Sequence, residues 1–406
     1  MTQRPTPRDR DAVHAADLID PERGFLPNPD PLARLPAVLD PWEEVAAELP
    51  KLLAQHRARR ALAAMPLLDA GVLADGPELR RAMLLLSYFG HAWVWQGPEV
   101  SDRLPPSVAV PWHAVARRLG RPPVLSYASY ALDNWRRLDP SAPIELGNLG
   151  LLQNFLGGVD EEWFILVHVE IEARAATALT SIPRAQAAAA AADPDRLGVE
   201  LRAMAESLEA MVAVLARMPE GCDPYIYYRR VRPYIHGWKD HPMLRGGVVY
   251  EGVAEYGGAG QRFRGETGAQ SAIVPALDAA LGIAHADDPL RPYLLEMRDY
   301  MTPEQRAFLV AVEAGPALRP FLAQVVSGEG LRIRAAAGGE AIELYDRCVT
   351  ALAAFRGQHL DYADRYIHRQ VPSGPDNPTD RGTAGTPFMA YLKKHLDETL
   401  AHRLGK

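Results

Sequence analysis

His359 and Arg356 are an imidazole and a guanidinium on the apolar face of one predicted helix. Residues 343–367 contain no proline and a single glycine. Apolar side chains recur there at helical spacing, so that one face carries Leu344, Cys348, Leu352, Phe355, His359, Ala363 and Tyr366. Neutral imidazole is a common metal ligand and the proximal ligand of many haem proteins. A haem would explain both residues, with His359 on the iron and Arg356 on a propionate.

The same helix also allows a purely structural explanation. A hydrogen-bonded core histidine gives this pattern when it lies beside an arginine whose aliphatic stem covers apolar surface. This helix alone does not decide between the two, so the rest of the chain must supply the other parts of a haem site.

A second histidine lies inside another apolar helix. Residues 161–182 contain neither glycine nor proline, and Phe164, His168 and Glu172 are four residues apart on one face. Glu172 could orient the His168 imidazole for catalysis, or it could simply satisfy a core histidine.

Aromatic and basic residues alternate in the segment 225–234, which includes Tyr227, Tyr228 and Arg232. Such a cluster could stack a planar substrate and bind its carboxylate in a bidentate pair. The alternative is the end of an amphipathic helix with solvated arginines. Nucleic acid is disfavoured, because the net charge is −7 and we find no other basic cluster.

Two glycine-containing segments complete the set of candidates. The stretch 264–271 matches neither common phosphate-binding glycine motif, but its glycines would let backbone pass close to a flat ligand. The segment 381–386 reads Arg-Gly-Thr-Ala-Gly-Thr and could close over a site.

These candidates must be positioned by helices, because strand-like alternation is nearly absent and the pattern predicts an all-α fold. We expect an extended arm at 1–40, a small helical domain at 41–150 and a large helical domain at 151–406. The helices are expected at 42–49, 52–68, 79–95, 112–119, 126–137, 161–182, 195–218, 270–281, 289–300, 303–313, 317–326, 343–367 and 387–403, with loops at 97–111 and 372–386.

Composition narrows the class of protein further. The chain has 406 residues, 48% hydrophobic and 23% charged, which is ordinary for a globular protein. Its two cysteines predict neither a disulfide framework nor a cysteine metal site. The first residues lack the apolar core of a signal peptide, and no segment approaches the roughly 18 apolar residues of a membrane span. We therefore expect a cytoplasmic location and no membrane partner.

Together, and in this order, the segments resemble the indoleamine 2,3-dioxygenase family, as a bacterial-type member with a distal histidine. The resemblance covers most of 121–400 and is weak before about residue 110. It is carried by 122–135, 164–173, 232–239, 247–252, 267–271, 297–301, the His359 helix and 382–386. Several separate motifs in collinear order are far more specific than any one of them.

The resemblance implies a haem b cofactor and assigns residues around it. His359 would be the proximal iron ligand and Arg356 a propionate partner. Arg232 would bind the substrate carboxylate. His168 stands where the mammalian members have serine, so it would be a distal histidine and a hydrogen-bond partner for the indole nitrogen.

The remaining pocket residues follow from the same resemblance. Tyr227 and Tyr228 occupy the positions of two phenylalanines in the mammalian enzymes, and Tyr127 matches another pocket aromatic. Gly268 would lie in the turn near the indole, and Thr383 would be the threonine of the loop over the substrate. Residues 41–150 would cover the haem pocket as a small helical domain.

The activity implied is insertion of both atoms of O2 across the indole C2–C3 bond of L-tryptophan or a related indoleamine, giving N-formylkynurenine. An electron donor would keep the iron ferrous. The alternative within the superfamily is an oxygenase acting on a modified indole or another aromatic amino acid in secondary metabolism. Alternatives of other classes are a haem-binding sensor or carrier and a ligand-free structural protein. Whether the chain is a monomer or a homo-oligomer is not decided by the sequence.

Overall fold

The structure is a computed structural model that describes residues 15–97, 99–286, 290–327, 335–371, 374–375, 377–385 and 387–405. It confirms the all-α prediction. The α-helices are α1 (Asp40–Ala54), α2 (Ala58–Ala64), α3 (Pro77–Trp95), α4 (Pro106–Leu119), α5 (Val159–Ala190), α6 (Pro194–Leu215), α7 (Met218–Gly221), α8 (Pro224–Ile226), α9 (Ile273–Leu281), α10 (Leu290–Met297), α11 (Pro303–Ala314), α12 (Leu318–Ser327), α13 (Ala335–Ala363) and α14 (Met389–Ala401).

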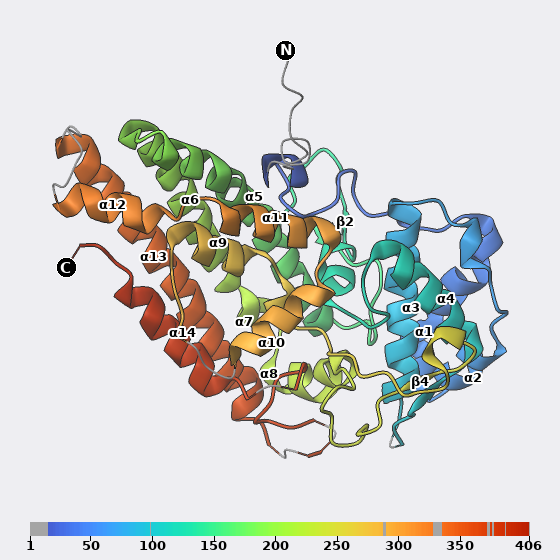
Figure 1. Ribbon diagram of the computed structural model, residues 1–406. Coiled ribbons are helices and arrows are strands. Elements are labelled where there is room, and N and C mark those ends of the chain that lie inside the picture. The colour runs from blue at the N-terminus through green and yellow to red at the C-terminus, as the bar shows by residue number, and fades with distance from the viewer. Residues whose placement is uncertain are drawn as a thin grey trace, which may run out of the picture.

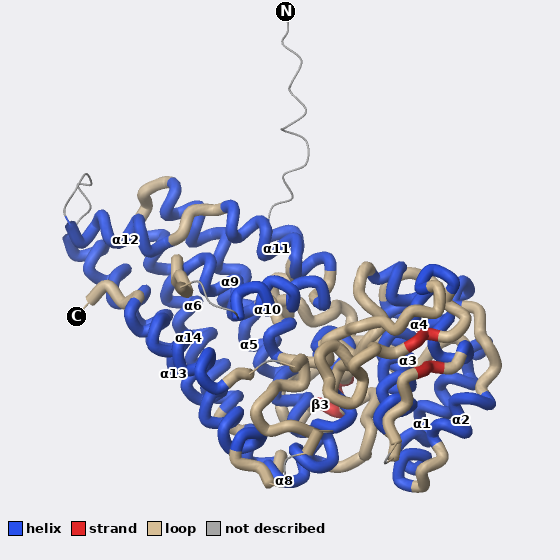
Figure 2. The backbone as a smooth tube through the Cα atoms, turned by 60° about the horizontal axis from the view of Figure 1, so that its bottom comes forward, coloured by secondary structure: helices blue, strands red, loops and turns tan. Residues whose placement is uncertain are grey.

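The strands found in the described residues are two residues long and form two small pairs. β1 (Arg103–Leu104) pairs in parallel with β4 (Val249–Tyr250), and β2 (Arg136–Arg137) pairs antiparallel with β3 (Leu149–Gly150). Figure 2 shows these strands as short stretches among helices and loops. They fasten loops to one another and do not form a layer of the fold.

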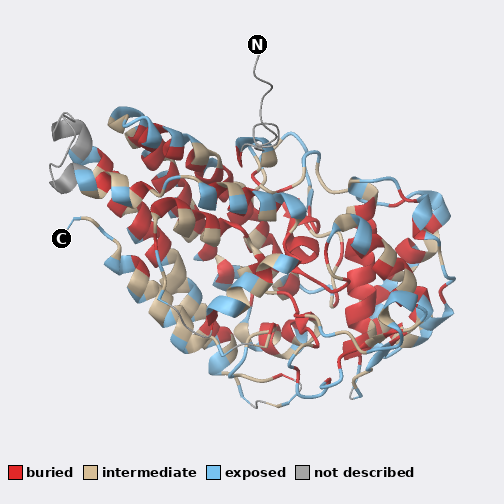
Figure 3. Ribbon diagram, in the orientation of Figure 1, coloured by how far each residue is buried: buried red, intermediate tan, exposed pale blue. Residues whose placement is uncertain are grey.

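Two groups of helices make up the molecule. Helices α5, α6, α13 and α14 lie side by side in one group, whereas α1 to α4 gather at the other end (Figure 1). Burial is densest along α3 and in the interior of the α5–α6 region (Figure 3). This arrangement fits the expected small and large domains, but their boundary near residue 150 stays a prediction. None of the described helices is long and apolar enough to cross a membrane.

Helix α3 is buried over nearly its whole length because α4 packs tightly across it. Gly90 makes this approach possible, since a Cβ atom there would lie 2.0 Å from the Trp112 ring. Any side chain at this position would force the two helices apart. At the far end, the left-handed C-cap Gly120 stops α4.

Helix α5 is the longest helix in the described part of the chain and supplies His168. Asp160, Glu161 and Glu162 lie in its first turn, where negative charge complements the helix dipole. The helix was expected to stop at residue 182, but it continues through Pro183 to Ala190. That expectation was wrong because the alanine-rich stretch 185–190 has strong helix propensity and packs on α6.

Other element boundaries also differ from the predictions. The expected helix at 126–137 is only the π-helical turn η5 (Ala128–Leu132), followed by strand β2. Helix α4 begins at Pro106, inside the expected loop 97–111, because proline is favourable in a first helical turn. The helix of His359 begins at 335 and ends at Ala363, where the π-helical turn η11 (Asp364–His368) follows.

Cys222 and Cys348 are both buried and free. Of the expected loop 372–386, residues 372, 373, 376 and 386 lie outside the described part of the chain. Residues 1–14 of the expected N-terminal arm lie outside it as well.

Candidate active site

The His359 imidazole is reachable from outside yet crowded by protein. His359 is exposed, although the apolar residues Leu352 and Ala363 on the same face of α13 are buried. Desolvation by the surrounding protein, and secondarily the charge of His168, lower the pKa of His359 to about 4. None of the described residues hydrogen-bonds its ring nitrogens. His359 is therefore a neutral imidazole near His168, and neither of its nitrogens is committed to another described residue.

His168 has one nitrogen committed to its own helix. Its Nδ1 lies 2.7 Å from the carbonyl oxygen of Phe164, which can only accept, so Nδ1 carries the proton. Burial lowers the pKa of His168, which keeps the ring neutral near pH 7. Because a neutral imidazole carries one proton, Nε2 has a free lone pair and can accept a hydrogen bond. No hydrogen bond or ring contact between described residues joins His168 to Glu172, so the structure shows neither of the two roles that the spacing left open for Glu172.

Glu172 instead faces the glycine-containing segment. Its Oε1 accepts a hydrogen bond from Ser271 Oγ at 2.8 Å, and the Tyr127 hydroxyl lies beside its carboxylate. Burial raises the pKa of Glu172 to about 7. Helical spacing correctly put Glu172 on the face of His168, but the carbonyl oxygen of the preceding turn was the better-placed acceptor.

An aromatic cluster surrounds His168. The Phe164 ring centroid lies 4.7 Å from that of His168 and 4.7 Å from that of Tyr227. The Tyr127 ring meets His168 edge-on at 6.0 Å, and the Tyr130 ring lies 6.3 Å from Phe164. These rings come from α5, the loop before η5, η5 itself and the π-helical turn η6 (Tyr227–Val231). They form an apolar wall with phenol groups in it, suited to a flat aromatic ligand.

Arg232 lies beside this wall and is completely buried. Its Nη1 donates to the Asn377 side chain and its Nη2 to the carbonyl oxygen of Arg381, whereas its Nε has no partner among the described residues. Its guanidinium lies over the Tyr228 ring, 5.6 Å from the centroid. No described carboxylate forms an ion pair with it. A buried guanidinium without an anion is the arrangement that a carboxylate ligand would complete.

The neighbouring residues Tyr227 and Tyr228 make different contacts. Tyr227 belongs to the aromatic cluster, whereas the Tyr228 hydroxyl donates to the carbonyl oxygen of Asn377. In turn, Asn377 Nδ2 donates a hydrogen bond to the Tyr228 carbonyl oxygen at 2.6 Å. The loop after η11 is thus hydrogen-bonded to Arg232. Asn377 could not be found from sequence spacing, because it lies 145 residues away from Arg232.

The same loop reaches the glycine-containing segment through Thr383. Thr383 Oγ1 donates to the carbonyl oxygen of Glu266, and the Thr383 carbonyl oxygen accepts from Gly237 N at 3.3 Å. Gly268 begins the 3₁₀ turn η9 (Gly268–Gln270), and a Cβ atom there would meet nothing within 4 Å. The structure therefore brings the loop threonine and the segment of Gly268 into one region.

Arg356 is part of an ion-pair network on the α14 side of α13. Its two Nη atoms pair with Asp278 at 3.0 and 2.6 Å, and Nη1 also donates to Thr399 Oγ1 at 2.6 Å. The described residues offer no acceptor for its Nε. A role toward a haem propionate stays a prediction.

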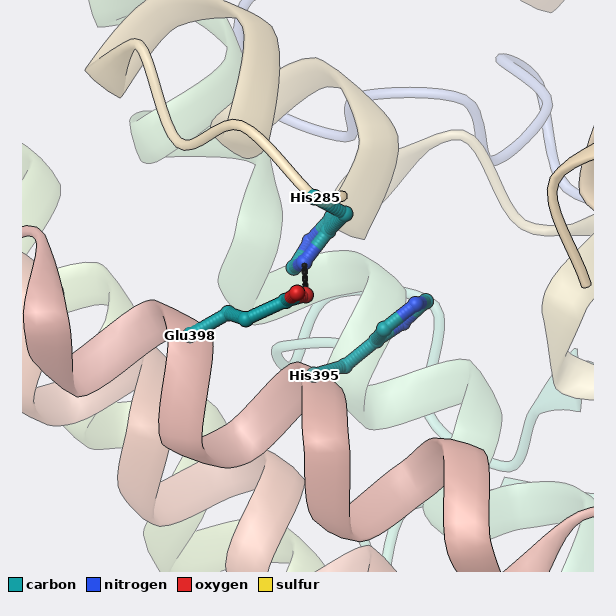
Figure 4. A group of neighbouring side chains, drawn as sticks. All are labelled: His285, His395 and Glu398. Atoms are coloured by element: carbon teal, nitrogen blue, oxygen red, sulfur yellow. Dashed lines mark hydrogen bonds and ion pairs between the residues drawn. The ribbon is translucent and has the colours of Figure 1, made fainter. Parts of the chain in front are cut away.

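Next to this network lie His285, His395 and Glu398, a combination that could in principle bind a metal. Figure 4 shows His285 reaching the Glu398 carboxylate, where Nδ1 and Oε2 are 2.7 Å apart. Its other nitrogen is 3.4 Å from Asp278. The His285 and His395 rings are stacked with centroids 4.0 Å apart, so their in-plane lone pairs do not converge on one ion. We interpret this group as an extension of the Asp278–Arg356 network.

Comparison with known proteins decides the family. The family model described as indoleamine 2,3-dioxygenase matches residues 16–402. Indoleamine 2,3-dioxygenase 2 of Mus musculus is 35% identical over 393 residues, covering 94% of this chain and 93% of its own length. Indoleamine 2,3-dioxygenase acdA of Aspergillus candidus is 36% identical, covering 94% and 95%. The chain belongs to the indoleamine 2,3-dioxygenase family.

The match extends through α1 to α4, where we found the resemblance weak. It makes this protein a haem-dependent dioxygenase, as the motifs implied. A further relative is named 6-hydroxytryptophan 2,3-dioxygenase fscD, from Fusarium equiseti, and is 32% identical over 89% of this chain and 86% of its own length.

The residues present fit a haem of this family. An iron ligand must be an unprotonated nitrogen that the protein does not otherwise use, and His359 meets both requirements. His168, which lies near it, keeps a free lone pair on Nε2 beside aromatic rings. The two imidazoles therefore differ in their donor chemistry, because His359 has two uncommitted ring nitrogens among the described residues and His168 has one.

Proposed function

We propose that this protein cleaves the indole C2–C3 bond of L-tryptophan, or of a closely related indoleamine, to give an N-formylkynurenine. The observation that supports this best is the combination, among the described residues, of an uncommitted imidazole, a cluster of aromatic rings and a buried guanidinium that has no ion-pair partner. An indole amino acid is flat at one end and carries a carboxylate at the other. Its ring matches the aromatic cluster, and its carboxylate matches Arg232.

The cofactor in this proposal is haem b, with His359 as its proximal ligand and Arg356 as a propionate partner. When bound, it supplies ferrous iron that activates O2 for addition to the indole, and an external electron donor keeps it reduced. The protein supplies the rest: a fixed substrate, a dry pocket and a defined orientation.

Arg232 holds the substrate carboxylate in this proposal. Tyr127, Phe164 and Tyr227 enclose the ring and keep water out. His168 accepts the indole N–H through Nε2, because its Nδ1 proton is committed to Phe164. It is a positioning group and not an essential base, since nothing in the proposed reaction requires it to remove a proton. Thr383 and Gly268 line the side that the loop closes.

A second candidate function is oxygenation of a modified indole or another aromatic amino acid. It is favoured by the polar groups in the wall, namely His168, Tyr130 and the phenol of Tyr227, and by the relative named for 6-hydroxytryptophan. We also propose that residues 41–150 cover the haem pocket and that the protein acts in the cytoplasm.

The decisive experiment is turnover of L-tryptophan by the reduced holoprotein under ¹⁸O2. We expect a product heavier than tryptophan by two labelled oxygen atoms. A product with one labelled atom would indicate hydroxylation and contradict the proposal. A haem protein that binds no indole amino acid would instead favour a sensor or carrier.

A further inference from the structure

The Asn377 side-chain oxygen has two neighbours, one of which takes no part in the proposed function. Arg232 Nη1 donates to this oxygen, and His236 Nε2 lies 3.2 Å from it. Asn377 Nδ2 donates to the Tyr228 carbonyl oxygen at 2.6 Å, which leaves Oδ1 as the acceptor on the other side of the amide. An amide oxygen has two lone pairs, so it can accept from Arg232 and His236 at once. His236 therefore reaches Arg232 through a single side chain.

The His236 ring donates to Asn377 as a neutral imidazole. Burial, and secondarily the charge of Arg232, lower the pKa of His236 well below its usual value, so the ring carries a single proton near pH 7. Because Asn377 Oδ1 can only accept, that proton lies on Nε2. His236 thus supplies a hydrogen bond without placing a second positive charge beside the buried guanidinium.

His236 is held in place by the end of α3. The residue is 2% exposed, and its carbonyl oxygen accepts a hydrogen bond from Trp95 Nε1 at 2.8 Å. The two rings meet edge-on, with their centroids 6.2 Å apart. His236 directly follows the 3₁₀ turn η7 (Arg232–Ile235). The histidine and the arginine therefore lie on one short segment that is hydrogen-bonded to α3.

The residue after His236 joins the same segment to the loop that follows η11. Gly237 N donates to the Thr383 carbonyl oxygen of this loop at 3.3 Å. Gly237 also lets the segment cross another stretch of backbone closely, since a Cβ atom there would lie 2.0 Å from Gly265 N. The His236 donor therefore has a defined position relative to the loop that carries Asn377.

The hydrogen bond from His236 determines which end of the Asn377 amide faces Arg232. Rotation of the amide by 180° would exchange its oxygen for its NH2 group, and a guanidinium has only donors. In that flipped state the NH2 group would meet the N–H donors of both Arg232 and His236, and these buried donors would lose their acceptor. The other acceptor of the guanidinium, the Arg381 carbonyl oxygen, belongs to the same loop. Loss of the His236 donor would therefore leave the guanidinium less well oriented.

We propose that His236 is a positioning residue for substrate binding, which holds the Arg232 guanidinium through Asn377 in the orientation that receives the substrate carboxylate. This inference rests on the proposed function, in which Arg232 binds that carboxylate. Hydrogen bonds from a second layer of residues are a general means of fixing a binding group. Because His236 acts on the guanidinium, its effect is confined to ligands that carry a carboxylate.

The test uses three substitutions of His236. His236→Leu removes the donor, and His236→Asn keeps a polar side chain that is too short to reach Asn377. His236→Gln places an amide N–H near the position of the imidazole Nε2 and should restore the hydrogen bond. His113→Leu is the matched control, because His113 is also buried but lies on α4 with its ring against Tyr256.

Binding of L-tryptophan is compared with binding of tryptamine, which lacks the carboxylate. Dissociation constants are measured from the ligand-induced change in the spectrum of the reduced, anaerobic holoprotein, and melting temperatures show whether each variant folds. Asn377→Leu is measured alone and together with His236→Leu, because substitutions of two residues that act through one another are not additive. Arg232→Met is measured beside them.

For His236→Leu and His236→Asn we expect about 3- to 10-fold weaker binding of L-tryptophan and less than about twofold change for tryptamine. His236→Gln and His113→Leu should both lie within about twofold of wild type for both ligands. His236→Leu should add less than about twofold to the effect of Asn377→Leu. If His236→Leu does not fold, the comparison of His236→Asn with His236→Gln decides.

Equal weakening of both ligands, or an effect that His236→Gln does not reverse, would make His236 structural and overturn the proposal. Unchanged tryptophan affinity, or full additivity with Asn377→Leu, would also overturn it. Arg232→Met separates this failure from that of the proposed function. If Arg232→Met weakens only tryptophan binding, the carboxylate site stands without His236. If it weakens both ligands equally, the assignment of Arg232 fails, and this inference fails with it.

Discussion

Arg232→Met tests the carboxylate clamp, because methionine replaces the guanidinium with an uncharged chain of similar length. Arg232 is completely buried, and its free Nε is the donor that a substrate carboxylate would use first. Loss of a charge-assisted hydrogen bond costs about 1.5–3 kcal/mol, which corresponds to roughly 10- to 150-fold weaker binding. We expect this loss for L-tryptophan and almost none for tryptamine, which has no carboxylate.

The fold should survive this substitution. The variant loses two hydrogen bonds, to Asn377 and to the Arg381 carbonyl oxygen, but it also removes a buried charge that has no ion-pair partner. These effects oppose each other, so the free energy of unfolding should change by only about 1–2 kcal/mol. Burial already lowers the pKa of Arg232 to about 10, which is a sign of the desolvation cost.

The assay is anaerobic titration of the reduced holoprotein with both ligands. Arg230→Met, an exposed position in the same segment, serves as the control and should change neither affinity. Equal weakening of tryptophan and tryptamine would refute the clamp and indicate a general disturbance of the pocket. Unchanged tryptophan affinity would refute it as well.

Three further predictions concern the distal side, pH and packing. His168→Ala should keep its haem. Its ratio of affinities for tryptophan over 1-methyltryptophan, which lacks the N–H, should be about 2- to 10-fold smaller than in the wild type. An unchanged ratio would contradict the hydrogen bond to His168. The pKa of Glu266 is raised from 4.5 to about 8, so the folded chain holds a proton that the unfolded chain releases. Its stabilising contribution is complete below about pH 4.5 and is lost as pH rises toward 8. Glu266→Gln should therefore flatten the fall in unfolding free energy between pH 5 and 8 by up to about 1.4 kcal/mol per pH unit in urea titrations, and parallel pH profiles would contradict this. Gly237→Ala should destabilise the apoprotein by more than about 3 kcal/mol, because its Cβ would lie 2.0 Å from Gly265 N. The control Gly246→Ala should be nearly neutral, because its Cβ would meet nothing within 4 Å. Similar melting temperatures of the two variants would refute the close crossing.

The helices that carry the two histidines could be predicted because periodicity is local information. His359 and His168 lie on α13 and α5 as their spacing indicated. The helix expected at 126–137 failed for the opposite reason. Tertiary contacts of the buried Tyr130 and Trp135 outweigh helix propensity there and leave only a π-helical turn.

The partners within the site could not be predicted from spacing. Glu172 lies one turn from His168 but bonds Ser271, which is 99 residues away along the chain. Asn377 and Glu266 sit in irregular segments whose conformation depends on long-range contacts, such as the Thr383 hydrogen bond to Glu266. The sequence shows Glu266 in a glycine-containing stretch. Only the structure shows that this residue is buried and that its carboxyl group has no hydrogen-bond partner among the described residues.

The central claim is that His359 holds the haem iron, and the most direct measurement is the absorption and resonance Raman spectrum of reduced His359→Ala beside wild type. The wild-type protein should show a five-coordinate ferrous haem with an iron–histidine stretching band. His359→Ala should lose the haem or that band, and added imidazole should restore the band, since imidazole replaces the missing ligand. His168→Ala should keep the band. A His359→Ala variant that purifies with full haem and an unchanged iron–histidine band would contradict the account.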